Sequence, residues 1–243
     1  MATIPLIETS TALCSVALVR DGETISYRES RAPKAHASLT AVFIQEVLEE
    51  AGLEVKDCDA VCVSMGPGSY TGLRVGVSTA KGLCFGANIP LIAVGTLDTL
   101  VSQAQMYADN PEEARADGVA FPAEADWKYV VPMVDARRME VYTAVFRPDG
   151  TRISEVEPKV IDADSFKDIL SEGPVLFIGD GAGKCEGTIC SPNARFVQCN
   201  PKASAMKKPA LKEFEAGSFR DTAYFEPFYL KEFVATTSRK KLF

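Results

Sequence analysis

Apolar and polar positions along the chain form the same pattern twice. The first copy is an apolar run that reaches Glu8, turns through small hydroxyl residues and returns as an apolar strand to Asp21-Gly22. The second copy reaches Asp135, turns, and returns in an alternating strand to Asp149-Gly150. An Asp-Gly pair after such a run predicts a tight hairpin turn, because its central positions must tolerate positive φ. Each copy therefore predicts antiparallel strands, with an acidic residue at the end of the first.

Both copies are followed by the same elements in the same order: a helical pattern, a short apolar strand and a glycine-rich turn. We expect these elements at residues 36–51, 60–64 and 66–68 in the first half, and at 165–170, 175–178 and 179–183 in the second. Four matching elements in one order predict an α/β protein of two duplicated lobes, with helices covering the sheets. We assign lobe I to residues 1–108, an acidic connector to 109–127, and lobe II with a C-terminal tail to 128–243.

The two helices expected in lobe I carry more apolar surface than one sheet can cover. The helix at 36–51 has two apolar stripes, and the helix after the first glycine turn is apolar on most of its circumference. This second helix also contains several glycines, each of which costs roughly 1 kcal/mol of helix propensity relative to alanine. Such glycines predict the close approach of a neighbouring backbone. The surplus surface is explained either by packing between the two helices or by docking of another protein.

The turn GPGSYTG, residues 66–72, lacks the defining features of phosphate-binding loops. No lysine follows Gly72, as a P-loop requires, and Thr71 stands where a dinucleotide fingerprint has its third glycine. A phosphate at the N-terminus of the following helix stays an open alternative, because the free N–H groups there attract anions.

The two acid turns would flank a cleft between the lobes, as phosphate-binding hairpins do in some kinases. Thr9 and Ser10 are small enough to approach a phosphate closely. The turn after Asp135 has no glycine and offers Arg137 only as a charge at a distance. Self-sufficient ATP hydrolysis or phosphoryl transfer is therefore not expected of this chain.

Composition and charge exclude several classes of function. The formal net charge is −7, which disfavours attraction of the whole surface to nucleic acid or anionic membranes; the basic clusters are Lys207-Lys208 and residues 238–241. His36 is the only histidine, so histidine-pair metal motifs are excluded. The N-terminus has no signal-peptide pattern and no apolar window has membrane-spanning length, so a cytoplasmic location is expected. The seven cysteines contain no C-x-x-C pair; we expect buried thiols, with a zinc site at the last three as the alternative.

Four segments resemble the bacterial TsaB family, also called YeaZ. They read KAHASLTAVFIQEVLEEAGL, MGPGSYTGLRVGVSTAKGL, VDARRMEVYTAVF and PFYLKEF, and the second is highly specific to this family and its relatives. The resemblance implies an ASKHA fold (actin-like ATPase, ribonuclease H-like), which agrees with the duplicated lobes. It also implies a part in forming N6-threonylcarbamoyladenosine beside the anticodon of tRNA (t6A modification).

In that system the resemblance implies a non-catalytic subunit of the threonylcarbamoyltransferase complex. The partner is TsaD, the metal-containing paralogue that transfers the threonylcarbamoyl group, and the small ATPase TsaE completes the assembly. The tRNA is expected to be engaged indirectly, with no membrane involved. The subunit itself is expected to need no cofactor and no metal, while ATP has a place in the assembled complex. The alternatives are an independent ASKHA-fold ATPase or small-metabolite kinase, and a metallopeptidase, which the lack of a histidine pair disfavours.

The TsaB family docks through the two lobe I helices, which form a four-helix bundle with those of TsaD, and homodimers use the same face. On this chain the resemblance implies the partner-interface residues Leu39, Phe43, Val47, Leu73, Val77 and Ala80. The family-motif loop comprises Gly66, Pro67, Gly68, Ser69, Tyr70, Thr71, Gly72 and Arg74. The residues expected on the nucleotide side are Glu8, Thr9, Ser10, Asp135 and Arg137. Glu8 stands where the family usually has aspartate, which weakens the expectation of metal or nucleotide binding at that turn.

Overall fold

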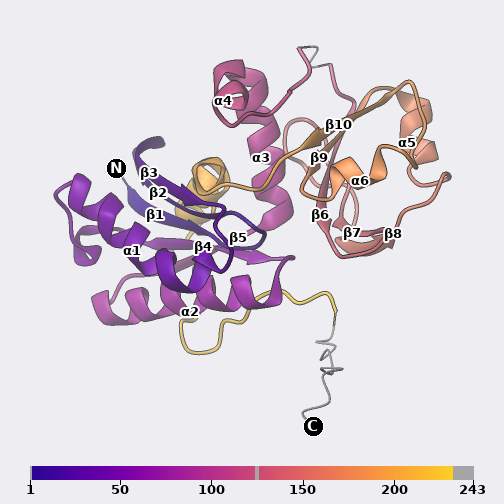
Figure 1. The fold of residues 1–243 in the computed structure, drawn as a ribbon. Coiled ribbons are helices and arrows are strands. Elements are labelled where there is room, and N and C mark those ends of the chain that lie inside the picture. The colour runs from indigo at the N-terminus through magenta and orange to yellow at the C-terminus, as the bar shows by residue number, and fades with distance from the viewer. Residues whose placement is uncertain (1, 124–125, 232–243) are drawn as a thin grey trace, which may run out of the picture.

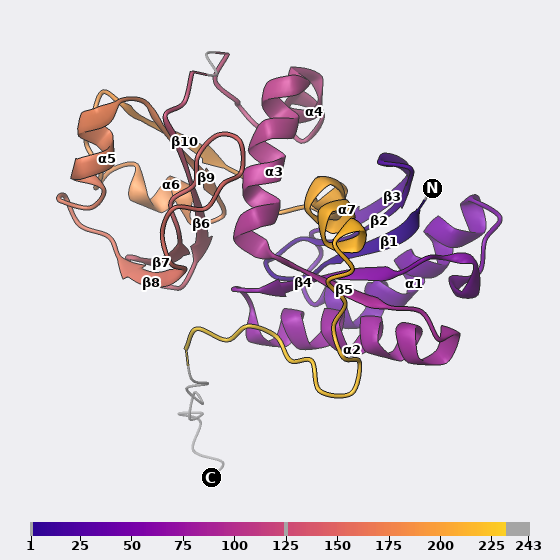
Figure 2. The same ribbon diagram turned by 180° about the vertical axis from the view of Figure 1, so that it is seen from behind.

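The computed structural model describes residues 2–123 and 126–231 of the 243-residue chain. The basic cluster at 238–241 and the end of the PFYLKEF segment lie outside the described residues. The described chain forms two lobes on either side of one long helix, α3 (Thr96–Asp109) (Figure 1). The reverse view shows the last helix, α7 (Lys207–Glu215), beside α3 on the side of lobe I (Figure 2).

Lobe I is built on a five-stranded sheet in the order β3-β2-β1-β4-β5. Its strands are β1 (Thr3–Glu8), β2 (Cys14–Arg20), β3 (Glu23–Ser30), β4 (Val61–Gly66) and β5 (Leu91–Gly95). β2 pairs antiparallel with β1 and β3, while β1, β4 and β5 run parallel to one another. The positive φ angles of Asp21 and Gly22, 53° and 84°, confirm the predicted turn between β2 and β3.

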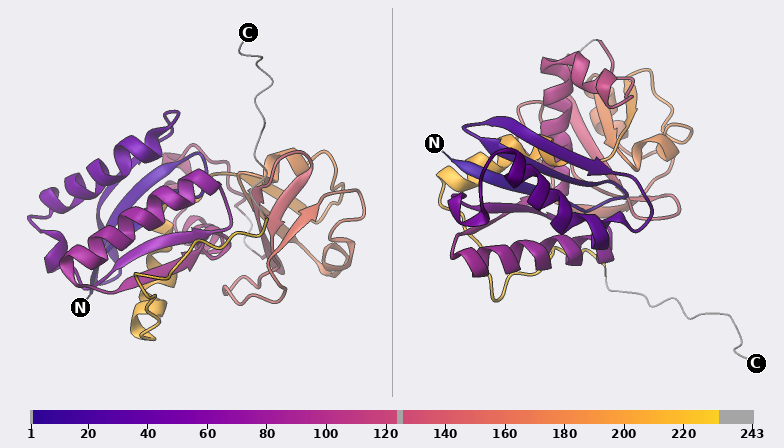
Figure 3. Two further views of the ribbon diagram at one scale, coloured as in Figure 1. Left: turned by 90° about the horizontal axis from the view of Figure 1, so that it is seen from below. Right: turned by 60° about the vertical axis from the view of Figure 1, so that its left-hand side comes forward.

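Helices cover both faces of the lobe I sheet. α1 (Ala35–Glu50) and α2 (Tyr70–Ala87) lie side by side on one face, as the view from below shows (Figure 3). Each helix leads back to a strand parallel to the one before it, so the two helices run in the same direction. The other face is covered by a short 3-10 helix, η2 (Ala203–Met206), and by α7. A second 3-10 turn, η1 (Val55–Asp57), lies between α1 and β4.

Lobe II repeats this layout with shorter helices. Its sheet has the order β10-β9-β6-β7-β8, which matches lobe I strand for strand when read from β8 to β10. The strands are β6 (Tyr129–Asp135), β7 (Glu140–Thr143), β8 (Glu157–Val160), β9 (Val175–Gly179) and β10 (Ala194–Gln198), and the helices in the places of α1 and α2 are α5 (Lys167–Glu172) and α6 (Ala182–Cys185). The parallel and antiparallel pairings also correspond, which confirms the predicted duplication.

The two lobes exchange segments and are not independent bodies. Leu97, Leu100 and Val101 of α3 belong to the core of lobe II, although α3 precedes that lobe in sequence. Conversely, Ala203 and the residues that follow return to the core of lobe I. A sheet has two faces to bury, and the helices that connect its own strands cover only one of them. The ranges 1–108 and 128–243 therefore contain the two sheets, but each completes the core of the other.

The acidic connector is partly structural rather than fully solvated. It forms α4 (Pro111–Ala116), in which Ala114 is buried. Both carboxylate oxygens of Asp117 accept from Nζ of Lys202 at 2.8 Å, and the two side chains are only 15% and 7% exposed. This buried ion pair ties the connector to the segment that returns from lobe II to lobe I.

Candidate protein interface and the acid turns

The Thr9-Ser10 turn of lobe I lies directly against the start of α2. The N–H of Ser69 donates to the carbonyl of Ser10 at 2.6 Å. A Cβ atom added to Gly68 would lie 2.3 Å from that carbonyl oxygen, and one added to Gly72 would lie 2.1 Å from the oxygen of Thr9. These two glycines therefore permit contact between backbones that no side chain would allow, as the sequence predicted.

The same contact buries the residues expected on the nucleotide side of lobe I. Glu8, Thr9 and Ser10 are at most 1% exposed. Burial raises the pKa of Glu8 to about 7, although hydrogen bonds from Ser10, including its N–H to Oε1 at 2.7 Å, oppose the rise. In this arrangement α2 covers both hydroxyl groups, so a phosphate could reach them only if the start of α2 moved away.

The corresponding turn of lobe II is exposed instead. Oδ1 of Asp135 accepts from the N–H of Arg137 at 2.7 Å and lies 2.5 Å from Nζ of Lys184. The N–H of Asp135 donates to Asp180, a carboxyl whose pKa is raised to about 6 by burial. Asp180 lies in the glycine-rich turn after β9 and Lys184 in α6, and neither was predicted from the sequence as a site residue. The nucleotide-side residues of the two lobes thus lie in different environments, one buried and one exposed with its acid already paired.

The family-motif loop begins α2 and holds it on the hairpin. Oγ of Ser69 accepts from the N–H of Gly72 at 3.3 Å and so caps the helix. Gly66 and Pro67 are buried, whereas Thr71 is exposed. Arg74, also exposed, donates to the hydroxyl of Tyr70 at 3.1 Å, and its guanidinium lies over that ring. The loop therefore serves the helix behind it, which is the structural role that its glycines indicate.

The residues predicted for the partner interface lie on the buried face of the two helices. Phe43, Val47, Leu73, Val77 and Ala80 are at most 9% exposed, and Leu39 is partly buried against the same core. This choice of face therefore needs correction. Helical periodicity identifies apolar stripes, but it does not show which of two stripes meets the sheet. A charge placed at Val77 would test folding rather than docking, because that side chain contacts its own core.

The exposed side of α1 and α2 carries a different apolar surface. A groove of about 540 Å³ runs between the C-terminal halves of the helices. Its lining residues are Ala41, Ile44, Gln45, Leu48, Glu49, Leu53, Glu54, Val55, Lys56, Gly82, Leu83, Gly86 and Ala87. Phe85 and Val42, on the same two helices, are 83% and 43% exposed. We name this surface, the lining residues together with Val42 and Phe85, the helix groove.

Two glycines of the helix groove differ from those at the start of α2. A Cβ atom added to Gly82 or Gly86 would meet no atom of the described chain within 4 Å apart from the adjoining part of α2 itself. The glycines of α2 thus fall into two classes, one that serves contact within the chain and one that does not. The sequence pattern places all of these glycines on neighbouring positions of one helix. Only the tertiary contacts distinguish the two classes and show that Phe85 is exposed beside the second class.

The C-terminal tail folds back onto lobe I along the flank of α2 that faces away from α1 (Figure 1). Nζ of Lys81 donates to the main-chain oxygen of Phe225 at 3.0 Å, and that ring packs on the lobe I core. The rings of Tyr70 and Tyr229 lie 4.9 Å apart between centroids. The aromatic tail therefore packs on lobe I and leaves the helix groove on the other flank of α2.

Among residues 2–123 and 126–231, no three histidine, cysteine or acidic side chains are arranged to hold a metal ion. Cys185 and Cys199 are buried free thiols and Cys190 is an exposed one, so the zinc alternative has no support in this arrangement. Within the described chain, no helix combines the length and hydrophobicity needed to cross a membrane.

Comparisons with known proteins agree with this geometry. The family model described as TsaD, tRNA N6-adenosine threonylcarbamoyltransferase, matches residues 29–224. The Escherichia coli K12 protein named tRNA threonylcarbamoyladenosine biosynthesis protein TsaB is 29% identical, with 94% of each chain covered. The Bacillus subtilis 168 protein of the same name is 31% identical over 73% of this chain and 70% of its own. A Pseudomonas aeruginosa crystal structure, described as similar to peptidase YEAZ, superposes with a TM-score of 0.78 at 25% identity, covering 95% of this chain and 100% of that one.

Two lobes of equivalent topology, each beginning with a strand that ends in an acidic turn, define the actin-like ATPase (ASKHA) class of α/β proteins. The predicted fold class is thereby confirmed. Within that class, the chain belongs to the TsaB (YeaZ) family, as its match to the Bacillus subtilis relative and to the TsaD family model shows.

Proposed function

We propose that this chain acts in the biosynthesis of threonylcarbamoyladenosine in tRNA as a non-catalytic subunit that binds TsaD through the helix groove. The names of its TsaB relatives and its match to the TsaD family model support the pathway. One observation carries the docking part: Gly82 and Gly86 are exposed helix glycines with open space above them, beside a phenylalanine that is 83% exposed.

The loss of helix stability caused by the exposed glycines indicates that a partner covers this surface. An interior helix glycine is less favourable than alanine by about 1 kcal/mol, and the described chain offers no packing that would offset it. Two glycines four residues apart lower the surface of a helix and let another helix approach closely. A fully exposed phenylalanine beside them supplies the large apolar side chain that anchors many interfaces. A helical partner that covers this surface explains both features at once.

The similarity of this chain to TsaD supports TsaD as the partner. Because residues 29–224 match the TsaD family model, the two proteins share a fold and TsaD has helices equivalent to α1 and α2. Two pairs of parallel helices can pack groove to groove, with an apolar floor and charged residues such as Glu49 and Lys56 at the edge. In this proposal TsaE joins the pair, tRNA is engaged indirectly, and ATP is used in the assembled complex with no cofactor on this chain.

The burial of the lobe I turn argues against the alternative of an independent ATPase or small-metabolite kinase. Thr9 and Ser10 are the residues with which lobe I would contact a phosphate, and α2 covers both. Purified chain assayed alone with ATP and Mg²⁺ separates the two functions. Rapid metal-dependent turnover that disappears in the Glu8→Gln variant would favour the alternative.

The docking proposal is tested by placing a charge in the helix groove. Phe85→Glu is expected to weaken binding to the TsaD of the same cell at least about thirtyfold, because an interface anchor is worth about 2 kcal/mol or more. Titration calorimetry measures the affinity, and a t6A assay with TsaD, TsaE, tRNA and threonylcarbamoyl adenylate measures function. Circular dichroism of the variant should be unchanged, since Phe85 is 83% exposed.

Val160→Glu is the matched control, because Val160 is 68% exposed on β8 in lobe II, away from the helix groove. It should leave the affinity for TsaD unchanged. If Phe85→Glu binds TsaD as tightly as the natural chain, docking at this face is contradicted. If it only dissociates a homodimer, the groove serves a second copy of the chain instead.

A further inference from the structure

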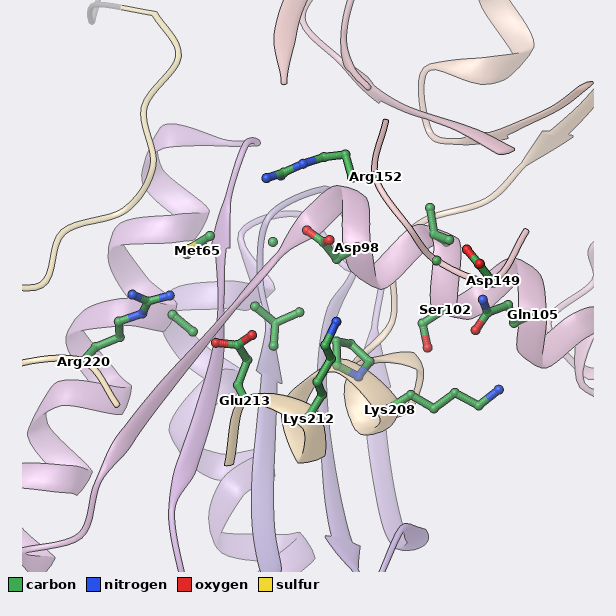
Figure 4. A pocket seen from close by; sticks show the side chains of 16 residues that line it. Met65, Asp98, Ser102, Gln105, Asp149, Arg152, Lys208, Lys212, Glu213 and Arg220 are labelled. Carbon is green, nitrogen blue, oxygen red and sulfur yellow. The ribbon is translucent and has the colours of Figure 1, made fainter. Parts of the chain in front are cut away.

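A second cavity lies on the side of lobe I opposite α1 and α2 (Figure 4). It has a volume of about 370 Å³, within the range of roughly 300–1,000 Å³ typical of small-molecule sites. Its walls come from the edge strand β5, the first turns of α3, helix α7 and the hairpin tip at 149–152. Both lobes thus contribute to it, and none of the proposed docking or nucleotide-side residues lines it.

Charged side chains of both signs meet in this cavity without pairing. They are Asp98, Arg152, Lys212, Glu213 and Arg220; Asp149 at the hairpin tip also borders the cavity, but its Oδ1 already accepts from the N–H of Thr151 at 2.8 Å. No two of these five, all within the described chain, form an ion pair within 4.0 Å, although Figure 4 shows them around one opening. Lys208 also borders the cavity, but its side chain points away from the other five and pairs with Asp109 at 3.4 Å.

Two of these groups, the carboxyl of Asp98 and Nε of Arg220, are partly withdrawn from water. Burial raises the pKa of Asp98, and the charge of Arg152 opposes the rise. Nε of Arg220 is buried and has no hydrogen-bond partner among the described residues. A buried donor without an acceptor is unfavourable, so this nitrogen favours a ligand that supplies one.

The edge of β5 adds main-chain groups to the same cavity. β5 is the last strand of its sheet, and the described part of the tail, up to residue 231, pairs with it only where the N–H of Arg220 donates to the carbonyl of Leu91 at 2.8 Å. Alternate residues of a strand direct their N–H and C=O groups to the same side. Ala93, which lines the cavity, therefore directs its N–H and C=O away from β4, on the side that Arg220 leaves unpaired.

The charges decide which class of ligand fits. A simple anion such as phosphate would lie close to the carboxylates of Asp98 and Glu213, and a divalent cation would lie close to three cationic side chains. A molecule with both charges satisfies both sets at once. We propose that this cavity binds a small zwitterion of the α-amino acid class, whose carboxylate meets Arg152, Lys212 and Arg220 and whose ammonium meets Asp98 and Glu213. This goes beyond the proposed function and does not depend on it.

The test uses the full-length chain and the twenty proteinogenic L-amino acids as probes. Binding is measured by amide chemical shifts and by titration calorimetry. At least one probe should bind and shift the amide signals of Ala93, Gly95 and Gly150, which border the cavity. The amide and the deaminated form of that probe should each bind at least about tenfold more weakly, because each lacks one charge-assisted set of hydrogen bonds.

Variants then assign the contacts. Arg152→Gln and Glu213→Gln should each weaken binding at least about tenfold, while Lys208→Gln, whose side chain points away, should leave it unchanged. Arg152 is exposed, so its replacement is compatible with folding, and circular dichroism checks each variant. The proposal is overturned if no probe binds at 10 mM, if binding is insensitive to both variants, or if inorganic phosphate or Mg²⁺ alone shifts the same signals more strongly. Binding of TsaD by these variants should not change, which keeps the two proposals separate.

Discussion

At the scale of single residues, Glu8 shows how burial changes what a side chain can do. The sequence places an acid at the end of β1, a position that was expected on the nucleotide side. The structure buries this carboxyl completely, beneath the start of α2, and raises its pKa to about 7. An ionised carboxylate in such a place is unfavourable unless it is well hydrogen-bonded. Glu8 is therefore a pH-sensitive part of the lobe I core rather than an open ligand.

This environment predicts a pH-dependent stability. The pKa of Glu8 is higher in the folded chain than its ordinary value of 4.5, so the folded state binds the proton more tightly. The resulting stabilisation is complete below about pH 4.5 and is lost as the pH rises through 7, by up to about 3 kcal/mol. In urea titrations between pH 5 and 8, Glu8→Gln should lose part of the decline seen in the natural chain.

Glu155→Gln serves as the control for this experiment, because Glu155 is exposed. It should keep the natural pH dependence. Parallel stability curves for Glu8→Gln and the natural chain over this range would contradict the shifted pKa.

At the scale of elements, the glycines of α2 have two different structural roles. Its first glycines, Gly72 and Gly76, lie against Thr9, and its last glycines have open space above them. The apolar periodicity correctly predicted a helix with too much apolar surface. It could not assign the faces, because Val77 and Leu83 are equally apolar and differ only in whether the sheet or the groove lies next to them. Phe85 was not among the residues predicted for the interface, because it lies outside both apolar stripes.

Substitution by alanine should change the stability of the chain in opposite directions at the two kinds of glycine. Gly82→Ala should stabilise the isolated chain by about 0.5–1 kcal/mol, because the methyl group meets no neighbour and the helix propensity improves. The same substitution should weaken binding to TsaD.

Gly72→Ala should destabilise the chain by roughly 1–3 kcal/mol, because its methyl group would overlap the carbonyl of Thr9. Thermal unfolding and calorimetric titration with TsaD measure both effects; a more stable Gly82→Ala that binds TsaD normally would leave the exposed glycines unexplained.

At the scale of the whole molecule, the lobes are joined by two crossing segments. α3 leaves lobe I and completes the core of lobe II, while residues 199–203 lead back. The buried pair Asp117–Lys202 lies where the connector meets this return path, and the hydroxyl of Tyr107 on α3 also donates to Asp117 at 2.6 Å. The acidic connector therefore helps to hold the two crossings together.

Removal of one partner of the Asp117–Lys202 ion pair should strongly lower the free energy of unfolding. Lys202→Met leaves the carboxylate of Asp117 buried without its counter-charge, so we expect a loss of about 3 kcal/mol in the free energy of unfolding. The double variant with Asp117→Asn should lose less than the sum of the two single changes. Lys128→Met is the control, because Lys128 and Glu172 are each nearly half exposed and such pairs contribute about 1 kcal/mol or less. Equal losses for Lys202→Met and Lys128→Met, measured by urea unfolding, would argue against a structural role of the buried pair.

The order of amino acids was sufficient to predict the two strand and helix patterns, their duplication, the Asp-Gly turns and the family, because each depends on residues that are close together in the chain. The tertiary structure alone decided which apolar stripe of α1 and α2 is buried, that the lobe I acid turn is covered, and that α3 and α7 complete cores in the opposite order to the sequence. It also brought the five unpaired charges of the second cavity together from α3, α7, the hairpin at 149–152 and the tail. These properties depend on contacts between distant segments, and local periodicity carries no information about which distant surface a side chain will meet.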